Sequence, residues 1–185
     1  MTIADSYFLS GERIYLREVN VTDVNANYYR WMNDPEVTQY LETRYSPHSL
    51  ERIRQFVESK DGQGDEIFLA MCLKEGNRHI GNIKLGPINW VHRFADISLL
   101  IGEKDCWGKG YASEAIGLIL QLAFQNLNLH KLRANCYAEN EGSRKAFRKN
   151  GFREEGCLKS QWFVKDHWVD EIYLGIENEI YHSPM

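Results

Sequence analysis

The sequence has little of what disulfide-rich, metal-binding or membrane-spanning chains carry. Only four of its 185 residues are cysteines, and Cys72, Cys106, Cys136 and Cys157 show neither a C-x-x-C pair nor a metal-ligand spacing. No apolar run reaches the roughly 18 residues that cross a bilayer, and the first residues lack a basic-then-apolar signal pattern. These absences predict reduced cysteines, no metal site, no membrane partner and a cytoplasmic protein.

The chain also lacks an excess of positive charge. Its 22 Lys and Arg stand against 26 Asp and Glu, a formal net charge of −4, so electrostatics do not favour nucleic acid as a partner. The P-loop pattern G-x-x-x-x-G-K-[ST] is missing, and so is the third glycine of the dinucleotide fingerprint G-x-G-x-x-G. Two common ways of binding phosphate are therefore excluded.

What is present is ordinary for a globular protein. Hydrophobic residues make up 43% of the chain and charged residues 26%. A chain of this length can bury a core, and no internal repeat or linker interrupts it. We therefore predict a single domain over residues 1–185.

The apolar periodicity predicts strands and helices that mix along the chain. Strands are predicted over residues 13–19, 67–74, 79–85, 94–101, 131–137, 152–158 and 169–176, and helices over residues 25–32, 46–60, 110–127 and 140–150. Hairpins in the first half and one strand–helix–strand crossover predict an α+β fold. The sheet is expected to be mixed and mostly antiparallel, with helices flanking it.

One stretch, W-G-K-G-Y-A-S-E-A over residues 107–115, joins a predicted strand to the strongest amphipathic helix pattern. Gly108 and Gly110 lie just before that helix. Free backbone N–H groups and the positive end of the helix dipole meet at such a point and favour an anion such as a diphosphate. A glycine turn that only caps the helix is the alternative.

This stretch resembles the acetyl-CoA signature Q/R-x-x-G-x-G/A of the GNAT acetyltransferases. A second segment, residues 140–152, resembles the family's later pattern N-x-x-S-x-x-x-Y-x-K-x-G-F. The first stretch is most similar to the branch of ribosomal-protein N-acetyltransferases and their small-molecule relatives. The resemblance implies an acetyl-CoA-dependent N-acetyltransferase with a GNAT-like sheet that splays apart after its fourth strand and holds CoA in the split.

The resemblance also implies which residues bind acetyl-CoA. Backbone amides of the glycine stretch would hold the pyrophosphate, and the main chain at the end of the preceding strand would pair with pantetheine. The expected cofactor-binding residues are Leu100, Ile101, Gly102, Gly108, Lys109, Gly110, Tyr111, Ala112, Ser113, Asn140 and Ser143. Lys109 as a solvated lysine, Asn140 as a plain helix cap and Ser143 as a first-turn serine remain alternatives.

Acetyl transfer also requires that the acceptor ammonium lose a proton. Asp96 lies where the family often has a Glu that relays this proton, and we predict it as the catalytic residue. The alternatives are that Asp96 is only a solvent-facing carboxylate, or that His92 is the base. Phe147 replaces the family's Tyr. Either Tyr111 or Tyr137 then supplies a proton to the leaving thiolate, or the thiolate needs no dedicated acid.

Two groups of aromatic residues predict the acceptor side of the cleft. They are Tyr28, Tyr29, Trp31, Tyr40 and Tyr45, and Trp162, Phe163 and Trp168. Aromatic rims suit sugars, nucleobases and peptide termini equally. We favour a small-molecule amine such as a nucleotide-linked amino sugar. A protein N-terminus, a polyamine and a catalytically silent acyl-CoA-binding module are the alternatives, and a homodimer is left open.

Overall fold

The structure, a computed structural model, describes residues 7–179 of the chain. Its strands join one eight-stranded sheet in the order β1-β2-β3-β4-β5-β6-β8-β7. All neighbouring strands in it are antiparallel except β5 and β6, which are parallel. The predicted α+β fold with a mixed, mostly antiparallel sheet is confirmed.

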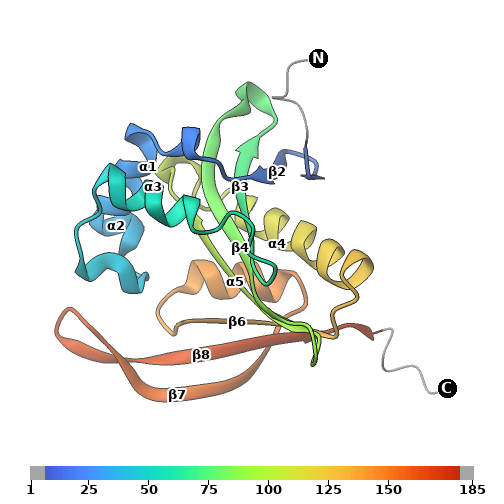
Figure 1. The fold of residues 1–185 in the computed structure, drawn as a ribbon. Coiled ribbons are helices and arrows are strands. Elements are labelled where there is room, and N and C mark those ends of the chain that lie inside the picture. Colours follow the sequence, from blue (N-terminus) through green and yellow to red (C-terminus); the bar gives the residue numbers. More distant parts are fainter. Residues whose placement is uncertain (1–6, 180–185) are drawn as a thin grey trace.

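The elements follow each other along the chain as Figure 1 shows. The strands are β1 (Leu9–Ser10), β2 (Ile14–Glu18), β3 (Ile67–Leu73), β4 (His79–Asn89), β5 (Phe94–Ile101), β6 (Lys131–Tyr137), β7 (Arg153–Val164) and β8 (His167–Glu177). The helices are α1 (Ala26–Asn33), α2 (Pro35–Thr38), α3 (Leu50–Glu58), α4 (Tyr111–Gln121) and α5 (Glu141–Lys149). None of them is long and apolar enough to cross a membrane within the described residues.

The largest differences from the predicted extents are in β7 and α4. The strand expected to end at residue 158 continues as β7 to Val164, because its pairing with β8 resumes after a register shift between Leu158 and Trp162. The polar residues between those two positions interrupt the apolar alternation that marks a strand. The helix expected over residues 110–127 changes into a π-helix at Leu122–Asn126, which widens its last turn.

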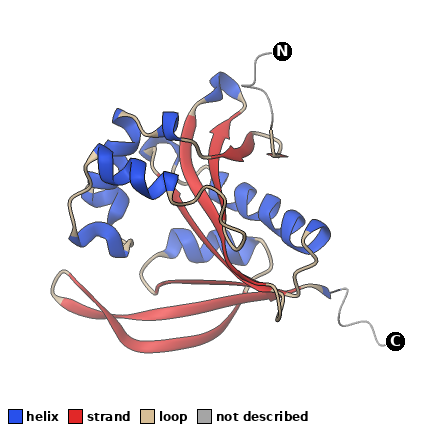
Figure 2. Cartoon of the chain, in the orientation of Figure 1, coloured by secondary structure: helices blue, strands red, loops and turns tan. Residues whose placement is uncertain are grey.

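Alternate residues of the strands pack against different helices. Leu16 and Met71 join the cluster that contains Ile116 of α4, whereas their chain neighbours Tyr15 and Cys72 join the cluster that contains residues of α1 and α3. Since side chains alternate across a strand, the two clusters lie on opposite faces of the sheet. Figure 2 shows helices on both sides of the strands accordingly.

The sheet opens between its two parallel strands. β5 and β6 pair only over Phe94–Asp96 and Lys131–Arg133, although β5 continues to Ile101 and β6 to Tyr137. In Figure 1, β6, β8 and β7 diverge from β3 and β4. Beyond the paired residues, no strand of residues 7–179 pairs with the edge of β5 that faces β6, so the sheet is split there.

Candidate active site

A cleft of about 710 Å³ occupies the split of the sheet. Its walls are formed by β5 from Ile97 onward, the end of β6, the start of α4, one side of α5 and a segment that follows α1. Nine of the eleven predicted cofactor-binding residues line it: Leu100, Ile101, Gly108, Gly110, Tyr111, Ala112, Ser113, Asn140 and Ser143. Segments that are far apart in the sequence thus meet at one cavity.

The other two predicted residues lie beside the cleft wall. Gly102 packs on the buried ring of Trp31, where a Cβ would come within 2.1 Å of an indole carbon. The carbonyl oxygen of Lys109 accepts a hydrogen bond from Nη1 of Arg13 at 2.8 Å. Neither is among the described residues that line the cavity.

The glycine turn lines the cleft at the start of α4. Gly108 and Gly110 have φ values of 72° and 86°, the left-handed region that side chains with a Cβ adopt at a cost. Gly110 is the N-cap of α4, and no side chain of the described residues caps this helix. The N–H groups of its first turn are therefore available to an anion, and the helix dipole adds positive potential there.

A contact from the beginning of the chain holds this turn in place. The Glu114 carboxylate accepts hydrogen bonds from the backbone N–H groups of Arg13 and Ile14 at 2.7 and 3.1 Å, and from Nε of Arg13 at 3.0 Å. Burial raises the pKa of Glu114, but these hydrogen bonds outweigh it and bring the pKa below its ordinary value. The ionised Glu114 thereby links β2 to the start of α4.

Two lysines of α5 bring positive charge to the same end of the cleft. Lys145 and Lys149 lie one helical turn apart and both line the cavity. Nδ2 of Asn150, directly after α5, donates to the carbonyl and hydroxyl oxygens of Ser113 at 3.0 Å each. The end of α5 is therefore fixed beside the glycine turn. Sequence reasoning missed these lysines, although their i,i+4 spacing was the available signal.

The opposite end of the cleft is acidic and aromatic. Its lining includes two carboxylates, Glu42 and Glu171, and three aromatic residues, Tyr40, Tyr137 and Trp162. A third lining carboxylate, Glu36, is bound by Lys104, which precedes the glycine turn. The Tyr137 ring stacks on Trp162 with centroids 5.5 Å apart and lies 5.6 Å from Tyr40. The polarity of the cleft thus runs from lysines and N–H groups at one end to carboxylates at the other.

Tyr137 is the centre of a hydrogen-bonded group at this acidic end. Its hydroxyl donates to Glu42 and accepts from Nη1 of Arg44 at 2.7 Å. Burial and the Glu42 carboxylate raise the pKa of Tyr137 to about 12, although Arg44 opposes them. The phenol therefore keeps its proton at neutral pH.

The family profile "Acetyltransferase (GNAT) domain" matches residues 13–153 of this sequence. The chain belongs to the GNAT acetyltransferases. It is an acyltransferase, and acetyl-CoA is its acetyl donor, as the resemblance of its two motifs implied. The match covers the glycine turn and the α5 segment, where those motifs lie.

Relatives of this GNAT protein include enzymes of known and unknown acceptor. It is 32% identical over 168 residues to a spermidine N(1)-acetyltransferase of Escherichia coli, with 89% of this chain and 82% of that one covered. It is 30% identical over 165 residues to the uncharacterized N-acetyltransferase p20 of Bacillus licheniformis, with 88% and 91% covered. These relatives agree on acetyl transfer to an amine.

Solved structures share the fold. The GNAT-family acetyltransferase of Bacillus anthracis superposes with a TM-score of 0.80 at 26% identity, covering 92% of this chain and 98% of that one. Spermidine N-acetyltransferase of Vibrio cholerae, solved with CoA and spermine, gives a TM-score of 0.81 at 24% identity, covering 92% and 99%. The architecture described above is thus that of the GNAT enzymes.

The residues of the cleft fit acetyl-CoA, which supplies an acetyl group activated as a thioester when it is bound. Apart from the two chain neighbours of Gly108, none of the described residues has a heavy atom within 4 Å of the place where its Cβ would stand, so a phosphate can approach the backbone there. Lys145 and Lys149 provide charge for the phosphates. The unpaired edge of β5 offers backbone groups to the amides of pantetheine. Within residues 7–179, no cluster of His, Cys, Asp and Glu is placed to hold a metal.

Phe147 remains the departure from the family's pattern. It is buried, lines the cleft and packs edge-on against Phe152, with the two ring centroids 4.9 Å apart. Both tyrosines that the sequence offered as alternative proton donors, Tyr111 and Tyr137, line the same cavity. The Tyr137 hydroxyl already donates a hydrogen bond to Glu42.

Asp96, the predicted base, lies at the last paired position before the split. Arg133 binds it with two hydrogen bonds of 2.8 and 3.1 Å, and neither side chain is among the described residues that line the cleft. His92 lies in the turn before β5 and is likewise not among them. The structure offers no contact that supports either residue as the base.

We expect Asp96→Asn to leave catalysis nearly unchanged. The Asp96 and Arg133 side chains are 37% and 42% exposed, and such ion pairs contribute at most about 1 kcal/mol to stability. Steady-state kinetics from pH 6 to 9 should give kcat/KM within about threefold of wild type, since no bond to substrate is lost. A large fall in kcat, with loss of the acidic limb of the pH profile, would show that Asp96 relays the proton after all.

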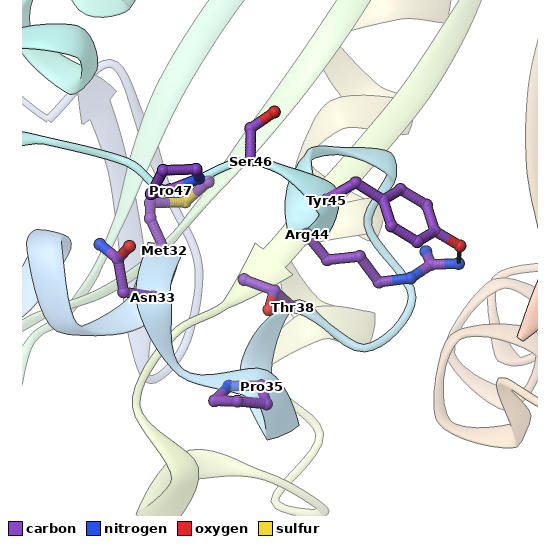
Figure 3. A pocket seen from close by; sticks show the side chains of 8 residues that line it. All are labelled: Met32, Asn33, Pro35, Thr38, Arg44, Tyr45, Ser46 and Pro47. Atoms are coloured by element: carbon purple, nitrogen blue, oxygen red, sulfur yellow. Dashed lines mark hydrogen bonds between the residues drawn. The ribbon is translucent and has the colours of Figure 1, made fainter. Parts of the chain in front are cut away.

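A second pocket of about 440 Å³ lies on the segment between α1 and α3 (Figure 3). It is lined by Met32, Asn33, Pro35, Thr38, Arg44, Tyr45, Ser46 and Pro47. Figure 3 shows the Arg44 guanidinium beside the Tyr45 hydroxyl, to which it donates a hydrogen bond. The lining contains no carboxylate among the described residues, so an ammonium group would find no partner charge there.

The predicted acceptor aromatics divide between the cleft and other places. Tyr40 and Trp162 line the cleft, Tyr45 lines the second pocket, and Tyr28 and Trp31 are core residues that are 3% and 1% exposed. Tyr29, Phe163 and Trp168 are exposed. Only part of each sequence group therefore lines the cleft.

Proposed function

We propose that this enzyme is a single domain over residues 1–185 that acetylates a primary amine on a cationic small molecule of the polyamine class. The observation that carries the proposal is the charge separation within the cleft. Glu42 and Glu171 line the end of the cleft at Tyr137, next to the N-terminus of α5, whereas Lys145 and Lys149 lie further along that helix. An ammonium group of the acceptor is attracted to Glu171, which has no cationic partner among the described residues, whereas an anionic acceptor is repelled.

The aromatic residues of the acidic end suit the same class. Polyamines alternate ammonium groups with methylene chains, and the faces of Tyr40, Tyr137 and Trp162 can contact both through apolar and cation–π interactions. The E. coli relative with 32% identity carries the name spermidine N(1)-acetyltransferase, which agrees with this chemistry. A nucleotide-linked amino sugar carries phosphates that this end would repel, and none of the relatives named above supports it.

In the reaction, the acceptor nitrogen forms a bond to the acetyl carbon and the carbon–sulfur bond of the thioester breaks. The nitrogen attacks as a neutral amine, so its ammonium form must first give up a proton. The N–H groups from Gly108 to Ser113 hold the donor, and the acidic end holds the acceptor. Phe147 donates no proton, and the thiolate, with an ordinary pKa of about 8 to 9, leaves without one.

The acceptor class is tested by the release of free thiol from acetyl-CoA in the presence of matched amines. We expect kcat/KM for spermidine to exceed that for a monoamine of similar length by at least tenfold, because one further ammonium–carboxylate contact contributes about 1.4 kcal/mol or more. The advantage should shrink in high salt.

An amino sugar, its nucleotide-linked form and a short peptide with a free N-terminus complete the panel. A preference for any of these over spermidine would contradict the proposed acceptor class while leaving the acetyltransferase activity in place. Mass spectrometry of the product shows that the acetyl group is on nitrogen.

A further inference from the structure

Glu171 is the most deeply buried carboxylate of the cleft. It lies on β8, is 2% exposed and lines the cavity. Its Oε1 accepts a hydrogen bond from Nδ2 of Asn135, and its Oε2 lies 3.4 Å from the Tyr173 hydroxyl. Both neighbours are neutral, and within the described residues no Lys, Arg or His side chain is at ion-pair distance from it.

The strand register places Glu171 at the acceptor end. β6 and β8 are antiparallel with Tyr137 directly opposite Glu171, so the two side chains stand next to each other on the same face of the sheet. Tyr137 is the residue that stacks on Trp162 and bonds Glu42. Glu171 therefore lies in the cleft beside the group formed by Tyr137, Trp162 and Glu42.

The other two carboxylates of the cleft already have cationic partners. Glu42 is bound by Arg44, with N and O atoms 3.4 Å apart, and Glu36 is bound by Lys104. Their side chains are also 52% and 70% exposed, respectively. Glu171 alone among the three combines burial with the lack of a cation. The Glu171 carboxylate therefore lacks a charged partner among the described residues, and a substrate ammonium would supply one.

We infer that Glu171 binds the reacting ammonium group of the acceptor and takes its proton. In this step an N–H bond of the ammonium breaks and its proton moves to a carboxylate oxygen of Glu171. The freed lone pair forms the bond to the acetyl carbon, and the electrons of the carbon–sulfur bond leave with the thiolate. The proton then passes from Glu171 to solvent. Asp96 is not suited to this role because Arg133 binds both of its oxygens.

The test compares Glu171→Gln with wild type, using whichever amine the wild-type enzyme acetylates fastest. Glutamine keeps the size of the side chain and an oxygen that can accept from Asn135. We expect kcat/KM for the amine to fall at least thirtyfold, as when one partner of a desolvated charge pair is removed. The acidic limb of the kcat/KM profile should disappear, and the Kd of acetyl-CoA should stay within about threefold.

A second acceptor separates proton removal from a structural role. A primary amine whose pKa lies below the assay pH is already neutral and needs no base. With it the deficit of Glu171→Gln should shrink at least tenfold, which damage to the fold would not produce. Glu155→Gln is the matched control, because Glu155 lies outside the cleft on the neighbouring strand and is bound by Lys131; it should behave as wild type.

Wild-type kcat/KM and an unchanged pH profile in Glu171→Gln would overturn the inference, and so would an equal deficit with both amines. If circular dichroism shows that this variant does not fold, Glu171→Asp decides. Aspartate keeps the charge but is shorter by one methylene. We therefore expect kcat/KM for the amine to fall at least tenfold while the acidic limb of the profile is retained. Wild-type activity in this variant would overturn the inference. The inference rests on the proposed amine chemistry but not on polyamines, because the best wild-type substrate is used whatever its class.

Discussion

Replacing Gly110 with valine should weaken acetyl-CoA binding about a hundredfold while the protein still folds. Gly110 has a φ of 86°, at the N-cap of α4, and a β-branched residue is a strong outlier in that region. Valine would relax the turn toward negative φ and turn its N–H groups away from the pyrophosphate. Losing two charge-assisted hydrogen bonds of about 1.5 kcal/mol each gives this factor. Isothermal titration calorimetry measures it directly.

Gly62→Val is the matched control for backbone strain. Gly62 has a φ of 71° and lies in the loop before β3, outside the cleft lining. Apart from its chain neighbours, no described residue has a heavy atom within 4 Å of the place where its Cβ would stand. The two variants should therefore lose similar stability in thermal denaturation, about 1–2 kcal/mol. Only Gly110→Val should lose affinity. Equal affinity in both variants would show that the turn does not bind the pyrophosphate.

The glycine turn could be predicted because it is a local feature. A strand, two glycines and an amphipathic helix are consecutive in the chain, and free N–H groups at a helix start follow from helix geometry alone. The same holds for Asn140, which was predicted either to cap α5 or to contact CoA. Its side chain accepts from the backbone N–H of Ser143 at 3.1 Å, and both residues line the cleft.

The remaining parts of the site depend on contacts between distant segments. Arg13 and Glu114 are 101 residues apart, and nothing in either local sequence indicates that they meet. Glu171 is marked out only by the register of β6 and β8, which puts it opposite Tyr137. Sequence alternation shows that a carboxylate on β8 faces one side of the sheet. It does not show that no cation lies there.

Asp96 illustrates the reverse case. Its position in a motif-like segment suggested a catalytic base, but the parallel pairing of β5 with β6 sets it directly beside Arg133. Cross-strand neighbours of opposite charge pair with each other. The partner of Asp96 thus lies on a strand about 37 positions later in the chain, and the local sequence around Asp96 does not indicate it.

Trp31→Ala should cost about 3–5 kcal/mol of stability, the range for deleting a buried aromatic side chain. Trp31 is 1% exposed, although the sequence suggested an aromatic of the acceptor rim. Its ring covers Gly102, and its Nε1 donates to Oε1 of Glu103 at 2.7 Å. Alanine would leave a cavity under the end of β5 and remove a hydrogen bond from a mostly buried carboxylate.

For a domain of this size the loss corresponds to a fall in Tm of roughly 6–20 °C, which differential scanning fluorimetry and urea unfolding would both detect. Tyr29→Ala is the control on the same helix, because Tyr29 is 45% exposed and surface substitutions usually change stability by about 0.5 kcal/mol or less. Saturating acetyl-CoA should recover part of the Tm of Trp31→Ala, since a ligand that binds only the folded state stabilises it by mass action. A loss no larger than that of Tyr29→Ala would mean that Gly102 and the end of β5 are not supported by this ring.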